Sequence, residues 1–343
     1  MASKQDKILF VSVQLPSFVR QDLEFLQERY QVRAFEFGIM KGVKMFVRQI
    51  QLLFWVLGNI WGAKYVYIWF ADYHALIPSL IAKLLGKPVF LVMAGYDAAN
   101  LPEYRYGAFI KPVRGWFVRQ NTRLADEIFP LSHFLVRQLE QNTQRSYGDK
   151  IKVTHLGGPI NQFKPEPGLS KNGSVICVSG GADVNRMKIK GVDFYAEVAR
   201  QCPEVQFIVV GITGDAKTWL DSIKPDNLAV LGWTKREELV ALYNRASVVC
   251  QFSRYEGFGM VLLEGMLCEC VPVSVVGIGP AEVIDEDCGF LIPEYDPKQG
   301  ADRVRLAIQQ QTKLGPISRQ KVVDGFAMQH RIERLMGVIE GYQ

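Results

Sequence analysis

Several features that would assign the chain to a particular class of protein are missing from the sequence. Its six cysteines form no CxxC pair, and no metal-ligand spacing occurs anywhere, so we expect neither a metal site nor a metal cofactor. Four of the six lie in or beside apolar runs, where a thiol acts as a small hydrophobic side chain. This favours a reduced cytosolic compartment over a disulfide framework. The cysteines are Cys177, Cys202, Cys250, Cys268, Cys270 and Cys288.

Long hydrophobic runs are also missing. The most apolar stretch, residues 52–63, is broken by Gly58 and Asn59 and falls short of the roughly 20 residues needed to cross a bilayer. The first residues, MASKQDKILFVSV, are too polar and then too short in their apolar run for a signal peptide. We therefore expect a cytoplasmic protein without a transmembrane span.

No dense basic stripe runs along the sequence. The formal net charge is +5 and the isoelectric point is near 8.8. This mild excess suits a protein that handles phosphorylated ligands or touches an anionic membrane, whereas proteins that bind nucleic acid usually carry a denser stripe. We expect no nucleic-acid partner.

The length and the alternation of patterns predict a two-domain α/β protein. The 343 residues exceed the usual size of one hydrophobic core. Apolar strand-like runs alternate with helical patterns, which predicts parallel sheets covered on both faces. The predicted strands cover residues 7–13, 31–37, 65–70, 89–93, 125–131 and 152–156, then residues 175–178, 205–210, 227–231, 247–252 and 271–275.

A break separates the two halves at residues 164–173, where two prolines and two glycines interrupt all periodicity. We predict Rossmann-like domains over residues 1–163 and 174–317, and a C-terminal helical segment, residues 318–343, that packs on a surface, with the N-terminal domain as one candidate. Two such domains facing one another would hold a ligand in a cleft at the carboxyl ends of both sheets.

The most specific segment begins where the strand over residues 247–252 ends. Glu256 comes next, and Gly257 and Gly259 let the backbone turn tightly into a helix. The first amides of this helix, around Gly259, Met260 and Val261, lack intrahelical partners and carry the positive end of the helix dipole. They predict a site for a phosphate or diphosphate.

Glu264 lies one turn further along the same helix. Its carboxylate can accept hydrogen bonds from two vicinal hydroxyls, as a ribose presents, while Glu256 can meet hydroxyls beyond the phosphates. The alternative is two surface glutamates beside a helix turn, because an E-x7-E spacing alone occurs often by chance.

Glu256 and Glu264 stand within the layout EGFG, LE, PV, GP and CGFL. This layout resembles the donor-binding half of the family 4 retaining glycosyltransferases, the GT-B enzymes of glycosyl transferases group 1. The resemblance covers nearly the whole chain but is specific only after residue 174. It implies a GT-B fold, metal-independent transfer from a nucleotide-diphosphate sugar (UDP or GDP), Glu264 on the ribose and Glu256 on the donor sugar. The implied donor-binding residues are Arg186, Lys190, Gly232, Trp233, Glu256, Gly257, Phe258, Gly259, Met260, Val261 and Glu264.

A basic loop after the strand over residues 175–178 supports the same interpretation. Family members place a basic pair, R…KG, in this loop, and Lys190 with Gly191 matches its second member, with Arg186 as the first. Two cations and a helix N-terminus can stabilise a departing diphosphate without metal. The alternative is a solvated basic loop. Gly232 and Trp233 follow the strand over residues 227–231, where relatives cradle the base, although Trp233 could equally be core packing.

Two further acidic features receive less weight. Residues 285–287 spell the D-x-D string of metal-dependent transferases, but they sit at a turn after a helix, and we interpret the string as incidental. Glu282, after Gly279 and Pro280, is similar to a family position near the donor.

The first domain resembles the family less closely. The glycine-rich loop that many relatives carry after the first strand is absent, and Ser17 or Arg20 are candidate substitutes. The histidine that many relatives carry after the fourth strand is replaced by Ala94, which leaves Asp97 as the nearest polar candidate for a catalytic role beside Glu256 and Lys190. His74 follows the third strand and is a further candidate, with a structural role as the alternative.

Residues 41–64 combine basic side chains with aromatic ones. The segment could lie on a membrane that carries a lipid-linked acceptor, or it could be a helix packed on the first sheet.

The sequence therefore predicts a retaining glycosyltransferase that passes a sugar to an acceptor hydroxyl of a sugar, glycan or lipid-linked molecule. Its location would be the cytoplasm, with the inner face of the membrane as an option. A nucleotide-sugar epimerase or hydrolase on the same fold, or an inactive donor-binding partner subunit, remains as an alternative.

Overall fold

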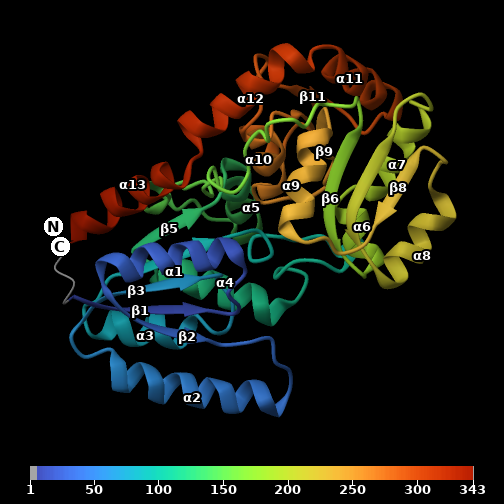
Figure 1. Cartoon of the computed structure of the whole chain (residues 1–343). Helices are drawn as coiled ribbons and strands as arrows, with labels where there is room; N and C mark the ends of the chain where they lie inside the picture. The colour runs from blue at the N-terminus through green and yellow to red at the C-terminus, as the bar shows by residue number, and fades with distance from the viewer. Residues whose placement is uncertain (1–5, 343) are drawn as a thin grey trace. The chain divides into compact units, whose positions relative to one another are not determined.

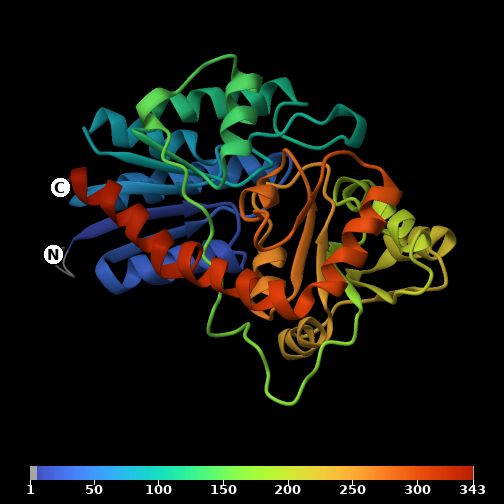
Figure 2. The same cartoon turned by 90° about the horizontal axis from the view of Figure 1, so that it is seen from above.

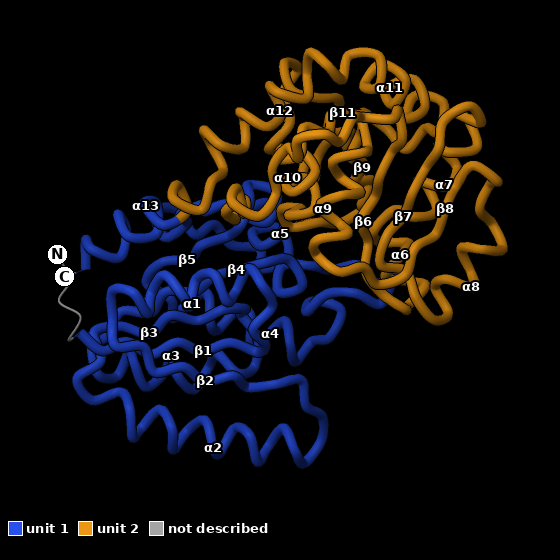
Figure 3. The backbone as a smooth tube through the Cα atoms, viewed as in Figure 1, with its two compact units in different colours: residues 1–155, 332–343 blue, residues 156–331 orange. Residues whose placement is uncertain are grey.

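The computed structural model describes residues 6–342; residues 1–5, which begin the segment considered above as a signal peptide, and residue 343 lie outside the described part. The chain divides into two compact units (Figure 3). Unit 1 comprises residues 1–155 and 332–343, and unit 2 comprises residues 156–331. This division falls ahead of the break predicted at residues 164–173, and the C-terminal segment from residue 318 is shared between the units.

Unit 1 contains a five-stranded parallel sheet in the order β2-β1-β3-β4-β5 (Figure 1). The central strands are buried almost throughout, as expected for a parallel sheet covered on both faces, whereas the edge strand β2 is mostly exposed. The strands are β1 (Lys7–Ser12), β2 (Gln31–Glu36), β3 (Ala63–Trp69), β4 (Val89–Met93) and β5 (Glu127–Pro130). The helices are α1 (Ser17–Arg29), α2 (Val43–Asn59), α3 (Leu76–Leu84), α4 (Pro112–Leu124) and α5 (His133–Thr143), with the short helices η1 (Pro102–Tyr104) and η2 (Gly148–Lys150).

Five of the six strands predicted for the first half are present, and the sixth prediction was wrong. Residues 152–156 form no strand, although the amides of Lys152 and Thr154 donate to carbonyls of β5. The chain then runs on without helix or strand to residue 174 (Figure 2).

Unit 2 contains a six-stranded parallel sheet in the order β11-β10-β9-β6-β7-β8. All five strands predicted for this half are present, and only the three-residue β11 was not predicted. The strands are β6 (Val175–Gly181), β7 (Phe207–Ile212), β8 (Leu228–Leu231), β9 (Val248–Gln251), β10 (Val271–Val275) and β11 (Phe290–Ile292). The helices are α6 (Val184–Ile189), α7 (Val192–Arg200), α8 (Gly214–Ile223), α9 (Arg236–Arg245), α10 (Met260–Leu267), η3 (Gly279–Glu282), α11 (Pro297–Gln309) and α12 (Gln311–Gly325).

The C-terminal segment forms two helices rather than one. After α12, a second helix α13 (Met328–Ile339) and the short η4 (Glu340–Tyr342) complete the chain. At the break between these helices, the backbone of Gly158 pairs with that of Ala327, and the Gly158 amide donates to Phe326 O at 2.6 Å. The hydroxyl of Tyr342 donates to Glu127 Oε1 at 2.7 Å, which joins the end of the chain to β5 within unit 1.

The strand order reverses once in each sheet, and this positions the candidate sites. In unit 1 the reversal lies between β1 and β3, and in unit 2 it lies between β6 and β9. Open α/β sheets bind ligands outside the carboxyl ends of their strands at such a switch point. The loops that follow these four strands are therefore the place to look for chemistry.

Candidate functional site

Lys190 and Glu256 meet at the switch point of unit 2. Lys190 follows β6 and α6, Glu256 follows β9, and their side chains form an ion pair. Glu256 also accepts hydrogen bonds from Gln251 Nε2 at 3.1 Å and from the Gly257 amide at 3.2 Å. The lysine, the glutamine and the backbone amide thus hold the partly buried Glu256 carboxylate in place.

The turn that presents Lys190 is clamped to the loop after β9. Gly191 has φ +69°, and a side chain there would collide with the carbonyl oxygen of Phe252. The Arg254 amide donates to Ile189 O at 2.7 Å, and its guanidinium binds both carboxylate oxygens of Asp193 at 2.7 and 2.9 Å. Sequence reasoning missed Arg254 and Asp193. Their only signal was that they lie close in sequence to Glu256 and to Lys190, respectively.

The start of α10 has glycines at its turn and no side-chain cap among the described residues. Gly259 precedes the helix with φ +93°, and no side chain of the described residues caps this end. Gly279 packs so closely against Gly257 that any side chain at Gly279 would collide with the Gly257 carbonyl. The Gly279 amide donates to Glu256 O at 3.1 Å. Backbone amides at a helix N-terminus bind anions, so Met260 and Val261 are positioned for that role.

Phe258 differs from the expectation that it contacts the donor. Its side chain is 1% exposed and lies 6.0 Å, ring to ring, from Phe326. It anchors the turn in the core, and its side chain has no surface to offer a ligand.

Glu264 lies half-buried one turn into α10. Burial raises the pKa of its carboxyl to about 7, against the lowering effects of the Arg236 charge and the Tyr243 hydroxyl. The group therefore changes charge near neutral pH.

The remaining donor candidates of unit 2 lie at the surface or line a hollow. Arg186 is exposed on α6, where its amide donates to the capping carboxylate of Asp183 at 2.8 Å. Trp233 is 79% exposed, so its interpretation as core packing was wrong. Gly232 lines a cavity of about 440 Å³ together with Thr234 and side chains of α9.

The acidic string at residues 285–287 is exposed and lies in a turn. Asp285 is paired with Lys321, and the hydrogen bond from that lysine lowers the pKa of the aspartate. Among residues 6–342, no three His, Cys, Asp or Glu side chains gather as they would around a metal ion. Glu282 ends η3 and is half-buried, directly after the Gly279–Pro280 step that packs on the Gly257 turn.

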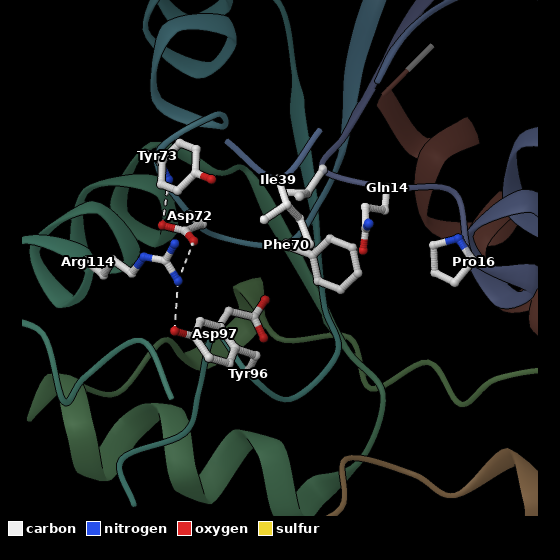
Figure 4. A pocket seen from close by; sticks show the side chains of 10 residues that line it. Gln14, Pro16, Ile39, Phe70, Asp72, Tyr73, Tyr96, Asp97 and Arg114 are labelled. Atoms are coloured by element: carbon white, nitrogen blue, oxygen red, sulfur yellow. Dashed lines mark hydrogen bonds and ion pairs between the residues drawn. The ribbon is translucent and has the colours of Figure 1, made fainter. Parts of the chain in front are cut away.

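Unit 1 has a pocket at its own switch point (Figure 4). It has a volume of about 330 Å³ and is lined by Val13, Gln14, Pro16, Ile39, Phe70, Asp72, Tyr73, Tyr96, Asp97 and Arg114. The Arg114 guanidinium lies 3.6 Å from Asp72, donates to the Tyr96 hydroxyl at 2.7 Å and sits over the Tyr73 ring. Burial raises the pKa of Asp72, and Arg114 opposes that shift.

Phe70 also faces this pocket and has φ +73°, a left-handed conformation that is costly for a bulky residue. Backbone strain of this kind concentrates at functional sites. Sequence reasoning missed Phe70 and Asp72 of the loop after β3, Tyr96 of the loop after β4 and Arg114 of α4. These residues form no pattern along the chain.

Asp97 and His74 have surroundings unlike those expected of catalytic groups. Asp97 is 1% exposed, and its carboxylate accepts the amides of Gly95 at 3.0 Å and Ala71 at 3.2 Å, so it joins the loops after β3 and β4. His74 is fully buried, with Nε2 2.8 Å from Trp69 O, and burial lowers its pKa to about 4. A neutral, enclosed imidazole corresponds to the structural alternative, not to a residue facing a cleft.

Ser17 and Arg20 lie exposed in the first turn of α1. Pro16 precedes this helix, and no side chain of the described residues caps it. Two amides of the turn donate to Pro16 O. That Ser17 or Arg20 substitutes for a glycine loop stays a prediction.

Comparison with known proteins assigns part of the chain to a family. Residues 167–322 match the family model described as "Glycosyl transferases group 1". This segment belongs to that family. A D-inositol 3-phosphate glycosyltransferase of Mycobacteroides abscessus is 27% identical over 174 residues, which are 45% of this chain and 38% of the relative. The N-acetyl-alpha-D-glucosaminyl L-malate synthase of Bacillus anthracis is 22% identical over 279 residues, 76% of this chain and 70% of the relative.

Solved structures show the fold over the whole chain. HepE of Anabaena, in complex with UDP and glucose, superimposes with a TM-score of 0.75 at 17% identity, over 98% of this chain and 100% of HepE. Sucrose-phosphate synthase of Thermosynechococcus elongatus gives a TM-score of 0.76 at 15% identity, over 98% and 99% of the two chains. The predicted GT-B fold, two parallel-sheet α/β domains, is confirmed. The predicted group 1 glycosyltransferase family is confirmed for residues 167–322.

Proposed function

We propose that the chain is a metal-independent retaining glycosyltransferase that moves a sugar from a nucleotide-diphosphate sugar to an acceptor hydroxyl, in the synthesis of a glycan, polysaccharide or glycolipid. The observation that carries the proposal is the Lys190–Glu256 pair beside the uncapped start of α10 at the switch point of unit 2. A UDP-sugar is the first candidate donor, because HepE binds UDP and UDP-glucose.

The donor binds unit 2 in this proposal. The amides of Met260 and Val261, together with Lys190 and Arg186, hold the diphosphate, and their positive charge stabilises it as it leaves. Glu264 accepts hydrogen bonds from the ribose hydroxyls, and the base lies near Gly232 and Trp233. Glu256, fixed by Lys190, Gln251 and the Gly257 amide, orients hydroxyls of the donor sugar.

Transfer with retention requires attack on the face that the diphosphate leaves. The bond from the anomeric carbon to the phosphate oxygen breaks, the acceptor oxygen bonds to that carbon, and the acceptor proton passes to an oxygen of the departing diphosphate. No side-chain nucleophile is needed.

The acceptor binds the pocket of unit 1. The aromatic rings of Phe70, Tyr73 and Tyr96 can pack against a sugar ring, and Asp72 with Arg114 can hold its hydroxyls. Asp97 acts here as a positioning residue that joins the two loops lining the pocket.

An epimerase or hydrolase is less well supported. Such an enzyme needs an acid or base poised for proton transfer. His74 is enclosed and neutral, and the Asp97 carboxylate is engaged by backbone amides.

The proposed location is the cytoplasm, at the inner face of the membrane. All six cysteines are buried free thiols, which suits a reducing compartment. Peripheral membrane contact through residues 41–64 is developed below.

A thermal-shift panel tests the donor. UDP-, GDP-, ADP- and TDP-sugars are added in EDTA to the wild type and to Glu264→Ala. A ligand at a hundred times its dissociation constant adds about 2.7 kcal/mol of stability. One nucleotide class should raise the melting temperature of the wild type and have a smaller effect on the variant. If no nucleotide sugar raises it, the donor site is refuted. Release of sugar from the stabilising donor, absent from Lys190→Met, separates the enzyme from an inactive partner subunit.

A further inference from the structure

One helix of unit 1 exposes a continuous apolar stripe. The side chains recur at helical spacing, so they share one face of α2 and of the turn after it. These residues, which we term the α2 apolar face, are Val43, Phe46, Val47, Ile50, Phe54, Leu57 and Trp61, each between 40% and 79% exposed. Monomeric proteins rarely expose apolar patches of more than a few hundred Å², and larger ones mark interaction sites.

The opposite face of α2 holds the helix in this orientation. Leu52 and Val56 are fully buried, and α2 lies along the β2 edge of the sheet (Figure 1). Arg48 donates to Phe37 O at 3.1 Å and lies over the Phe35 ring, and Gln49 donates to Tyr73 O at 3.1 Å. The helix is thus packed on unit 1, as one sequence interpretation had it, while its aromatic stripe faces outward.

Apolar side chains of neighbouring segments extend this surface. Leu80 and Leu84 of α3, the helix packed beside α2, are exposed. Ile39, 67% exposed just ahead of α2, also lines the pocket of unit 1. An exposed apolar side chain next to α2 in the chain thus stands at the pocket proposed for the acceptor.

The charges around the α2 apolar face have one sign. Residues 37–64 contain no aspartate or glutamate, and their basic residues are Lys41, Lys44, Arg48 and Lys64. Arg48 anchors the opposite face and Lys64 pairs with Asp6, so Lys41 and Lys44 are the cations left for a partner. Lys41 and Lys44 are exposed at the start of the helix. A second copy would bring like charges to this face, whereas an anionic lipid surface complements both its apolar and its basic character.

We propose that the α2 apolar face docks unit 1 on an anionic lipid bilayer, with α2 lying in the plane of the interface. Phe46, Phe54 and Trp61 enter the headgroup region, and Lys41 and Lys44 meet lipid phosphates. Within residues 6–342 no helix has the length and hydrophobicity to span a bilayer, so the contact is peripheral. The docking proposal rests on the proposed function for its purpose, which is to bring the pocket of unit 1 to an acceptor carried by a lipid.

Vesicle co-sedimentation of the full chain tests this proposal. The probes are vesicles of phosphatidylcholine alone and of phosphatidylcholine mixed with phosphatidylglycerol. Wild type should bind the mixed vesicles, and added salt should weaken the binding. Phe46→Ser with Phe54→Ser, and separately Lys41→Gln with Lys44→Gln, should each lower the partition coefficient by about tenfold or more.

The matched controls lie on α12, in unit 2. Ile317→Ser removes an exposed apolar side chain and Lys313→Gln an exposed cation, and both variants should bind like the wild type. All variants should keep the wild-type melting temperature, because the substituted side chains are exposed.

Three results would overturn the proposal. The first is that the wild type fails to bind anionic vesicles, and the second is that the α2 variants bind these vesicles as well as the wild type does. The third result is a concentration-dependent dimer of the wild type that the α2 variants do not form. Because vesicle binding is measured without donor or acceptor, its failure is distinguishable from failure of the glycosyltransferase proposal.

Discussion

Lys190 and Glu256 form an ion pair between the two loops that flank the switch point of the unit 2 sheet. One residue follows β6 and the other β9, so the pair exists only because the strand order reverses between them. A nucleotide sugar at this point would meet a cation for its phosphates and a fixed carboxylate for its sugar hydroxyls. In the proposed donor site, the ion pair would couple diphosphate binding to orientation of the sugar.

Replacing Lys190 by methionine should lower the rate of donor turnover without unfolding the protein. The cation would stabilise the leaving diphosphate, and removing one such group typically costs about 10²–10³-fold in rate. The ion pair is partly exposed, so its loss should change the melting temperature little. Release of nucleotide from the stabilising donor is the measurement, with Lys217→Met, on the exposed helix α8, as the control. An equal loss of nucleotide release in both variants would show that Lys190 does not act in the donor site.

Donor affinity should rise with pH through about 7. The ionised Glu264 carboxylate accepts two hydroxyls, whereas its protonated form does not, so affinity should increase about tenfold between roughly pH 6 and 8. Stability has the opposite sign. The folded-state pKa lies above the ordinary value, so the contribution of this group to stability is complete at low pH and is lost as pH rises through about 7. Calorimetric titration of a nucleotide sugar is the measurement, and Glu264→Gln should give a flat profile. A wild-type profile that is equally flat would show that Glu264 does not contact the donor.

Gly191→Ala should destabilise unit 2 by about 2–4 kcal/mol. The added Cβ would collide with the Phe252 carbonyl and displace the turn that presents Lys190. Gly86→Ala is the matched control, because Gly86 has nearly the same positive φ with open space around it. Urea denaturation measures both variants, and similar losses would show that the contact with Phe252 contributes nothing.

Asp97→Asn should reduce stability by about 2 kcal/mol and leave nucleotide affinity unchanged. An asparagine would place its NH2 group against one of the two backbone amides, of Ala71 and Gly95, that donate to the Asp97 carboxylate. Asp149→Asn, at an exposed position, should have no effect. Loss of transfer with full stability would instead assign Asp97 a direct catalytic role.

Arg114 and Asp72 should show energetic coupling in unit 1. Arg114→Met leaves the nearly buried Asp72 carboxyl without its cationic partner and should lower the free energy of unfolding by about 1–3 kcal/mol. This loss is smaller than for a fully buried pair because Arg114 is partly exposed. Adding Asp72→Asn should recover part of that loss. Urea denaturation of the two single variants and the double variant gives the coupling, and strictly additive losses would show that the pair is not a unit.

The sequence was most informative where function depends on a local pattern. The strand, the glycine turn and the helix around Glu256 are contiguous, and their spacing alone predicts an anion site. Burial could not be derived in the same way. Asp97 and His74 follow strands, as loop residues near a site do, yet packing encloses both. For α2 the pattern predicted a helix, but which aromatic side chains face outward depends on the anchor made by Arg48 and Gln49.

The pocket of unit 1 shows a second limit. Phe70, Asp72, Tyr96 and Arg114 come from three segments whose approach depends on the sheet order. No spacing along the chain links them, so only the fold brings them together.

Calorimetric titration of UDP in EDTA, with wild type, Glu264→Gln and Asp285→Asn, tests the central claim most directly. The account predicts binding to the wild type without metal, weakened about tenfold or more by Glu264→Gln, which removes a charged hydrogen-bond acceptor, and unchanged by Asp285→Asn. Should UDP fail, GDP is titrated in the same way. If neither nucleotide binds without a divalent cation, or if Asp285→Asn abolishes binding while Glu264→Gln does not, the metal-free donor site in unit 2 is contradicted.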